Sequence, residues 1–282
     1  MDEMTNTEII NETKKAHQII VCFKITDDYD EILPKEWKAL ASGKRPETGY
    51  VRRIFGCFDE AALENGLLLK QMLQRERQDI QLTALTLNPG YSENLIKKIT
   101  AVGYDRVVCL ESGSNYDFAP QKTARILSGF IKQEEDVSYI ITGKQCAPGS
   151  SGMVPFYLSE YLKRPLIRDV VEFVNTGRRI CAVAEYPDRF SWKALASCEI
   201  FSMGNSRKSF LRIPTLREKM KYRSFEPECR QADLFHDDTG MRFFAVNQER
   251  NVQFTDEARF AELCTDLVGQ EKQDESFTDT GF

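Results

Sequence analysis

Short apolar runs alternate with amphipathic segments between residues 19 and 162, and this alternation constrains the fold more than any other feature of the chain. The runs with the length and β-branched content of buried strands are residues 19–23, 80–87, 106–110 and 137–142. The segments with the apolar spacing of amphipathic helices are residues 58–77, 92–103, 120–132 and 154–162. This order predicts an α/β fold, a parallel twisted sheet with flanking helices on both faces.

The pattern changes after Pro165. Three short alternating stretches follow, separated by the turn residues Thr176-Gly177 and Pro187-Asp188. The stretches cover residues 169–175, 179–186 and 190–197. They predict antiparallel strands added to the edge of the sheet. Residues 26–53 carry proline and glycine at intervals, so we expect an irregular segment there, with a short strand over 50–55.

Three parts of the chain follow from these patterns. Residues 1–17 are a polar N-terminal lead-in, residues 18–205 an α/β domain, and residues 206–282 a C-terminal arm. The arm has a basic stretch, one late helix near residues 256–268, and a polar end that we expect to be disordered.

Composition and charge exclude several classes of protein. The 282 residues include 38 Lys plus Arg and 43 Asp plus Glu, for a formal net charge of −5, which is not the balance of a dedicated polyanion binder. No apolar stretch approaches the roughly 20 residues of a membrane span, and the acidic N-terminus has no signal-peptide core. We therefore expect a cytoplasmic protein with no membrane insertion and no nucleic-acid partner.

The residue types of common catalytic and metal sites are scarce. Eight cysteines contain no CxxC pair, which removes the sequence basis of zinc and iron–sulfur sites. Several of them lie in apolar runs, which favours buried small apolar side chains there. The two histidines, His17 and His236, fall in the lead-in and the arm. Walker A, GxSxG, HExxH and GxGxxG motifs are absent. We expect no catalytic acid, base or nucleophile and no metal.

One loop has the composition of an anion site. Residues 143–152 read Gly143-Lys144-Gln145-Cys146-Ala147-Pro148-Gly149-Ser150-Ser151-Gly152 and lead from a strand into a helix. Bare amides at a helix N-terminus bind anions, and ligands of parallel sheets lie at the carboxyl ends of the strands. The loop therefore fits a phosphate site, and it fits a solvated connection equally well.

Two other segments have a structural and a functional interpretation each. Asp59 and Glu60 open the helix that follows residue 57, where acidic side chains complement the helix dipole, and this role is favoured over ligand binding. Leu216, flanked by Arg212 and Arg217, fits either an apolar anchor for a protein partner or an ordinary solvated basic segment.

Six segments, taken in order, resemble motifs of the beta subunit of electron transfer flavoproteins. They are Ile20-Val21-Cys22-Phe23-Lys24, Gly56-Cys57-Phe58-Asp59-Glu60 with Ala62, Glu64, Leu69 and Lys70 behind it, Ala101-Val102-Gly103-Tyr104-Asp105-Arg106, Thr123-Ala124-Arg125-Ile126-Leu127, Gly143-Lys144-Gln145-Cys146, and Leu211-Arg212-Ile213-Pro214-Thr215-Leu216. The likeness covers residues 18–225, and six short motifs in the family's order are specific.

The resemblance implies a fold like the adenine nucleotide α-hydrolase-like domains, and an electron carrier subunit that pairs with an alpha subunit. FAD would be held mainly by the alpha subunit, with AMP or a second FAD in this chain. The flavin would exchange electrons with a flavin-dependent dehydrogenase, such as an acyl-CoA dehydrogenase, docked at Arg212 and Leu216. The residues that the resemblance places at the nucleotide are Cys22 and Leu87 (adenine), Gly56, Cys57, Phe58, Asp59 and Tyr29 (nucleotide and flavin side), and Gly143, Lys144, Gln145, Cys146, Gly149, Ser150, Ser151 and Gly152 (phosphate).

Departures from the family pattern leave two alternatives open. Pro148 stands where the family commonly has aspartate, and Gly56-Cys57 stands where it has Asn-Pro. A proline has no N–H to donate to a phosphate. The alternatives are a stand-alone adenine-nucleotide-binding module without electron transfer, and a scaffold subunit that binds no nucleotide.

Overall fold

A computed structural model of the chain describes residues 17–41, 49–76, 79–90, 92–114, 116–235, 243–246 and 252–255. The chain divides into two compact units, Met1–His236 and Asp237–Phe282. In the second unit, β12 (Phe243–Val246) pairs with β13 (Val252–Thr255) in antiparallel orientation. The late helix, the polar C-terminal end, His236 and the first 16 residues lie outside the described residues.

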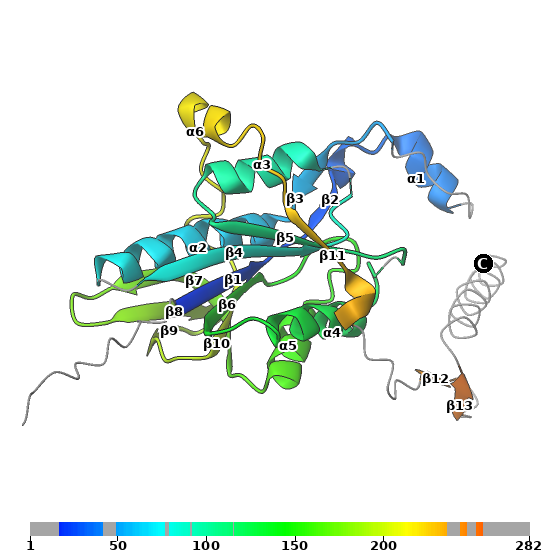
Figure 1. Ribbon diagram of the computed structural model, residues 1–282. Coiled ribbons are helices and arrows are strands. Elements are labelled where there is room, and N and C mark those ends of the chain that lie inside the picture. Colours follow the sequence, from blue (N-terminus) through cyan, green and yellow to red (C-terminus); the bar gives the residue numbers. More distant parts are fainter. Residues whose placement is uncertain are drawn as a thin grey trace, which may run out of the picture. The chain divides into compact units, whose positions relative to one another are not determined.

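The first unit is built on a nine-stranded, mostly parallel sheet in the order β11-β5-β4-β1-β6-β10-β7-β8-β9 (Figure 1). Its central parallel strands are β1 (His17–Cys22), β4 (Ile80–Leu87), β5 (Arg106–Glu111) and β6 (Val137–Gly143). The expected α/β fold with a parallel sheet is confirmed. His17, which we placed in the lead-in, begins β1 instead, at the end of the strand opposite to Cys22.

Helices cover both faces of this sheet, as the alternation predicts. Figure 1 shows α2 (Cys57–Arg75) and α3 (Glu93–Ala101) on one face, with α4 (Pro120–Ile131) and α5 (Val154–Leu162) on the other. Successive residues of β1 alternate between the two cores: Ile19 and Val21 pack on the α2 side, Ile20 and Cys22 on the α4 side. This alternation follows from the two-residue period of a strand that is buried on both faces.

The antiparallel edge is also present. β7 (Leu166–Asn175), β8 (Ile180–Tyr186) and β9 (Arg189–Ala194) pair as an antiparallel meander. One strand was not expected: β10 (Glu199–Met203) lies between β6 and β7 and is parallel to both. All five of its residues are buried, so it is a central strand although its apolar run is short.

The expectation that residues 26–53 are irregular is wrong for the part that the structure describes. This segment contains the end of β2 (Ile25–Asp27), the 3-10 turn η1 (Tyr29–Glu31) and α1 (Pro34–Ala41). β2 pairs with β3 (Arg53–Phe55) as a small antiparallel sheet. Each of these elements is short. The hydrogen bonds between β2 and β3 join segments that are distant in sequence, and the local spacing of apolar residues does not predict such pairing.

The chain after residue 205 returns to the sheet. α6 (Leu216–Lys221) begins with a capping box between Thr215 and Glu218, and β11 (Glu228–Gln231) pairs with β5 in parallel. The 3-10 turn η2 (Ala232–Phe235) then brings the Phe235 ring to 5.6 Å from that of Phe130 on α4. Among the described residues, no helix has the length and apolar content needed to cross a bilayer.

The seven described cysteines only partly match the expectation of buried apolar side chains. Cys22, Cys109 and Cys181 are buried, and Cys146 is partly buried. Cys57, Cys198 and Cys229 are exposed.

Candidate functional site

A cavity of about 870 Å³ opens at the carboxyl ends of the central parallel strands. Its walls include the last residues of β1, β4, β5 and β6 and the loops that follow them. Parallel α/β sheets place their ligands at this edge, because there the loops diverge and the helix N-termini point toward the opening. The cavity is therefore the candidate functional site.

Most of the expected cofactor-binding residues meet in this cavity. Those that line it are Cys22, Asp59, Leu87, Gly143, Lys144, Gln145, Cys146, Ser150, Ser151 and Gly152. The structure thus brings together residues from β1, α2, β4 and the loop after β6. That they bind a nucleotide stays a prediction.

Five expected residues do not line the cavity. Gly56 is buried behind it, Tyr29 and Phe58 are partly buried, and Cys57 and Gly149 are exposed. Gly149 nevertheless has a packing role, because a Cβ at this position would lie 2.6 Å from the carbonyl oxygen of Asp117.

A second wall of the cavity was missed by the sequence reasoning. It consists of the turn after β4 and the segment between β5 and α4, including Asn88, Pro89, Gly90, Glu111, Ser112, Gly113, Ser114, Tyr116, Asp117 and Thr123. Asn88 joins its two halves, since its side chain accepts from the Ser112 amide at 2.7 Å and donates to the Ser114 carbonyl at 2.8 Å. The signal was available in the sequence, because both segments directly follow predicted parallel strands.

The loop after β6 forms the opposite wall and leads into α5. Its polar contacts are local: the Ser150 amide donates to the Cys146 carbonyl at 3.1 Å, and the Met153 amide donates to the Ser151 hydroxyl at 3.3 Å. Pro148 lines the cavity and follows a cis peptide bond. Ser150, Ser151 and Gly152 line the cavity, although the Ser150 amide is already bonded within the loop.

The three cationic side chains of the lining are each paired with a carboxylate. The Nζ atoms of Lys24 and Lys144 lie 2.6 Å from Asp117 Oδ1 and Asp169 Oδ1, and Arg53 lies 3.3 Å from Asp27. Their charges are partly compensated before any ligand arrives. Attraction of an anion thus depends mainly on backbone amides at the loop and at the start of α5.

Asp59 is the buried acidic group of the site. The residue is 6% exposed and its carboxyl lies close to Gly56, Gly143 and Cys146, and its Oδ2 atom has no hydrogen-bond partner among the described residues. Burial away from water raises the pKa of Asp59 to about 7, against the opposing effect of the Cys146 thiol, of neighbouring amides and of the Lys24 charge. The carboxyl therefore changes its charge near neutral pH.

The thiols of the site are poor nucleophiles. Burial raises the pKa of Cys22 to about 12 and raises that of Cys146 further, with the Asp59 charge adding to both shifts. A nucleophilic cysteine needs the opposite shift. Within the described ranges, no three His, Cys, Asp or Glu side chains are grouped so that they could hold a metal ion.

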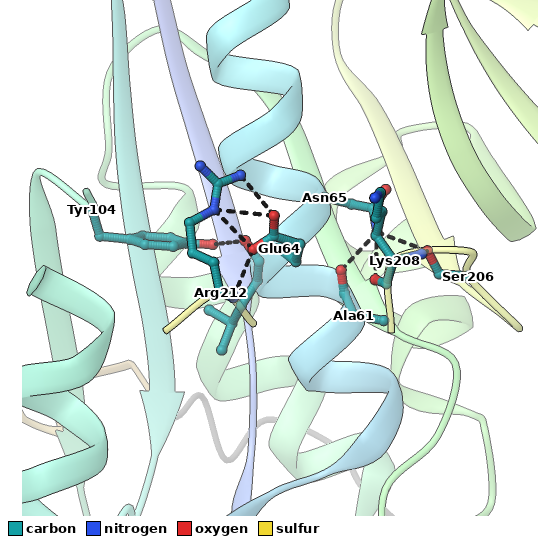
Figure 2. A network of polar contacts seen from close by, with 8 residues as sticks. Ala61, Glu64, Asn65, Tyr104, Ser206, Lys208 and Arg212 are labelled. Atoms are coloured by element: carbon teal, nitrogen blue, oxygen red, sulfur yellow. Dashed lines mark hydrogen bonds and ion pairs between the residues drawn. The ribbon is translucent and has the colours of Figure 1, made fainter. Parts of the chain in front are cut away.

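Arg212, which we expected at a docking surface, contacts α2. Figure 2 shows its guanidinium beside Glu64, with Nη2 donating to Oε1 at 2.6 Å and Nε donating to both carboxylate oxygens at 3.1 Å. The backbone amide of Arg212 also donates to Glu64 Oε2 at 3.0 Å. Leu216, at the start of α6, is 74% exposed, as are its apolar neighbours Phe210, Ile213 and Met220 to similar degrees.

Comparison of the sequence with known proteins identifies related proteins. The sequence pattern of the electron transfer flavoprotein domain matches residues 50–187, which include α2, the ends of β4, β5 and β6, and the loop into α5. Residues 50–187 of this chain thus match an electron transfer flavoprotein domain. The expected recognition is confirmed at this level.

A relative in Escherichia coli (strain K12) carries the name "Putative electron transfer flavoprotein subunit YgcR". It is 31% identical to this chain over 156 residues, which are 55% of this chain and 58% of that protein. The chain therefore spans less than two thirds of the length of this flavoprotein relative.

The departure from the flavoprotein pattern at Gly56 has a physical reason. A Cβ at this position would lie 2.4 Å from Asp59 Oδ2 and 2.5 Å from Cys146 Sγ. Asp59 and Cys146 pack so tightly over this residue that a side chain such as asparagine would displace both. The Gly56 position is thus matched to its own neighbours.

Proposed function

We propose that this chain is a beta-type subunit of an electron transfer flavoprotein, and that its cavity holds the adenylate group of AMP or of FAD. The observation that carries the proposal is the cavity itself, in a chain that matches the flavoprotein domain, at the edge of the sheet where nucleotides bind. An alpha-type subunit would be its partner.

The cavity suits a ligand of this class. Its volume of about 870 Å³ lies within the range of about 300–1,000 Å³ that is usual for ligand and cofactor sites. Three polar atoms of its lining residues, Arg53 Nε, Asp59 Oδ2 and Thr142 Oγ1, are buried and have no hydrogen-bond partner among the residues that the structure describes. Buried polar atoms are normally paired, so unpaired atoms at this cavity fit a site whose ligand is part of the packing.

Each wall has a distinct task in this proposal. The backbone at Cys22 and Leu87 binds the adenine, and the loop from Gly143 to Gly152 binds the phosphate through its amides. Ser112 and Tyr116, whose hydroxyls lie 3.1 Å apart, belong to the wall between β5 and α4. A flavin, when bound, supplies the electron transfer, and this chain orients and shields it.

The exposed apolar side chains around α6 fit a docking surface for a flavin-dependent dehydrogenase. Phe210, Ile213, Leu216 and Met220 are exposed close together in sequence, and clustered apolar side chains of this kind are common at protein contacts. In this proposal Arg212 acts by holding the segment to α2 rather than by touching the partner.

Calorimetric titration of the full chain with AMP and with FAD tests the proposal, using a matched pair of glycine variants. Gly152 and Gly177 both have positive φ, +65° and +81°, so valine strains the backbone at either position. Only Gly152 lines the cavity; Gly177 lies in the turn between β7 and β8.

We expect wild type and Gly177→Val to bind AMP or the FAD adenylate, and Gly152→Val to lose binding at least tenfold. Co-production with an alpha-type subunit should give a yellow complex. Binding of neither nucleotide, together with a colourless complex, would favour the scaffold alternative. Tight AMP binding by a chain that forms no complex would favour the stand-alone module.

A further inference from the structure

Asp59 is buried at the cavity, although an acidic residue in the first turn of a helix can interact with the helix dipole from the surface. The first turn of α2 contains both Asp59 and Glu60. Glu60 has the usual surface arrangement, with Lys98 Nζ 3.3 Å from its Oε1. Asp59 is instead buried and belongs to the cavity lining. The two neighbours thus have the same helix-dipole position and different surroundings.

Two glycines make the space for the Asp59 carboxyl. A Cβ at Gly143 would lie 2.5 Å from Asp59 Oδ1, and a Cβ at Gly56 would lie 2.4 Å from Oδ2. Gly143 is also the first residue of the expected phosphate loop. The carboxyl therefore lies directly beneath the segment whose amides would face a phosphate.

The groups that favour the ionised form of Asp59 are the Cys146 thiol, the backbone at Lys24 and Gly143 and the Lys24 ammonium, and burial of the carboxyl outweighs them. Cys22 of β1 and Cys146 of the loop lie near it, and the Cys146 thiol donates to the Ala147 carbonyl at 3.3 Å. Lys24 is the nearby cation, and its ammonium is 2.6 Å from Asp117 Oδ1. An ionised Asp59 would hence repel an anion in the loop.

We propose that Asp59 takes up a proton when the cavity binds a phosphate-bearing nucleotide, so that nucleotide affinity depends on pH. The proton comes from the buffer and forms an O–H bond on the carboxyl, which becomes neutral and can donate a hydrogen bond to a phosphate oxygen. The proposal rests on the proposed function, because it requires a phosphate in the loop.

The direction of the effect follows from charge. A phosphate monoester carries about −1.5 to −2 at pH 7, and a second negative charge close to it favours the protonated carboxyl. With a pKa of about 7, the unliganded carboxyl is mostly ionised at pH 8. Binding at pH 8 should then draw in close to one proton.

Calorimetry with AMP tests this at pH 8, in HEPES and in Tris, whose ionisation enthalpies differ. We expect an uptake approaching one proton per AMP bound. We also expect the wild-type affinity for AMP to fall about tenfold from pH 6 to pH 8, beyond any change that a variant without the carboxyl shows over the same range. Asp59→Asn is that variant, and its proton uptake should be close to zero. Glu60→Gln removes the same charge one residue away and should keep the wild-type uptake.

Adenosine gives a second test on the wild-type chain alone, should Asp59→Asn fail to fold. It lacks the phosphate and should bind without proton uptake. AMP binding without proton uptake, or uptake that persists in Asp59→Asn, would overturn the inference while leaving the nucleotide site intact. Absence of binding by AMP and FAD at every pH would overturn the proposed function and the inference with it.

Discussion

The contact between Glu64 and Arg212 gives the sharpest stability prediction. Arg212→Met removes a guanidinium that donates to both oxygens of Glu64, whose side chain is only 9% exposed. Methionine keeps much of the apolar stem of arginine, so packing changes little. The variant leaves a largely buried carboxylate without its cation.

The expected cost follows from the exposure of the two partners. Removal of one partner of a fully buried pair costs about 3–5 kcal/mol, and exposed pairs are worth less than about 1 kcal/mol. The Arg212 side chain is 34% exposed, and the backbone amide of residue 212 still donates to Glu64 after the change. We therefore expect a loss of about 2 kcal/mol in the free energy of unfolding.

Urea denaturation followed by circular dichroism measures this loss. Arg217→Met, on the exposed face of α6, removes the same charge close by in sequence and should change stability by less than about 0.5 kcal/mol. In a double-mutant cycle with Glu64→Gln, the two changes should be coupled by more than about 1 kcal/mol. Equal stabilities of Arg212→Met and Arg217→Met would refute the reasoning that Arg212 anchors this segment.

Three further predictions concern packing and charge. Gly56→Ala should destabilise the chain by about 1–3 kcal/mol and weaken AMP binding, because its Cβ would collide with Asp59 and Cys146. Denaturation measures the first effect and calorimetry the second, and no change in stability would contradict the close packing. Gly129→Ala should lower the melting temperature although alanine favours helices, because its Cβ would lie 2.6 Å from the Phe235 carbonyl oxygen. Gly113→Ala is the control: no atom lies within 4 Å of its Cβ, so its melting temperature should be close to that of wild type. Asp59→Asn should gain stability relative to wild type as the pH rises from about 4 to about 7. Burial raises the carboxyl pKa from 3.8 to about 7, so the unfolded chain releases this proton at lower pH than the folded chain, and wild-type stability falls through that window by a few kcal/mol. The same stability difference between the two proteins in denaturation curves at pH 5 and at pH 8 would contradict this.

Local patterns were enough for the central sheet and its helices. The apolar runs of β1, β4, β5 and β6 are buried on both faces, and such strands read as continuous apolar segments. The limits of α5 were predicted as the structure has them. The place of β10 was not predictable in this way, because its position between β6 and β7 depends on pairing partners far along the chain.

The candidate site was likewise predictable only in part. The glycine-rich loop and the helix-opening Asp59 were visible in the sequence, and the structure puts both in one cavity. The burial of Asp59 was not visible, because it depends on Gly56 and Gly143 approaching from other elements. The direction of Arg212 toward Glu64 likewise requires a contact between residues 148 positions apart.

Hydrogen–deuterium exchange of the full chain, with and without AMP, tests the central claim most directly because it reports where the nucleotide lies. The account predicts slower exchange on AMP binding in residues 144–152, 88–90, 112–114 and 116–117, most of which line the cavity, and no change in the β8–β9 hairpin. AMP binding that protects other segments and leaves the loop after β6 unprotected would contradict it.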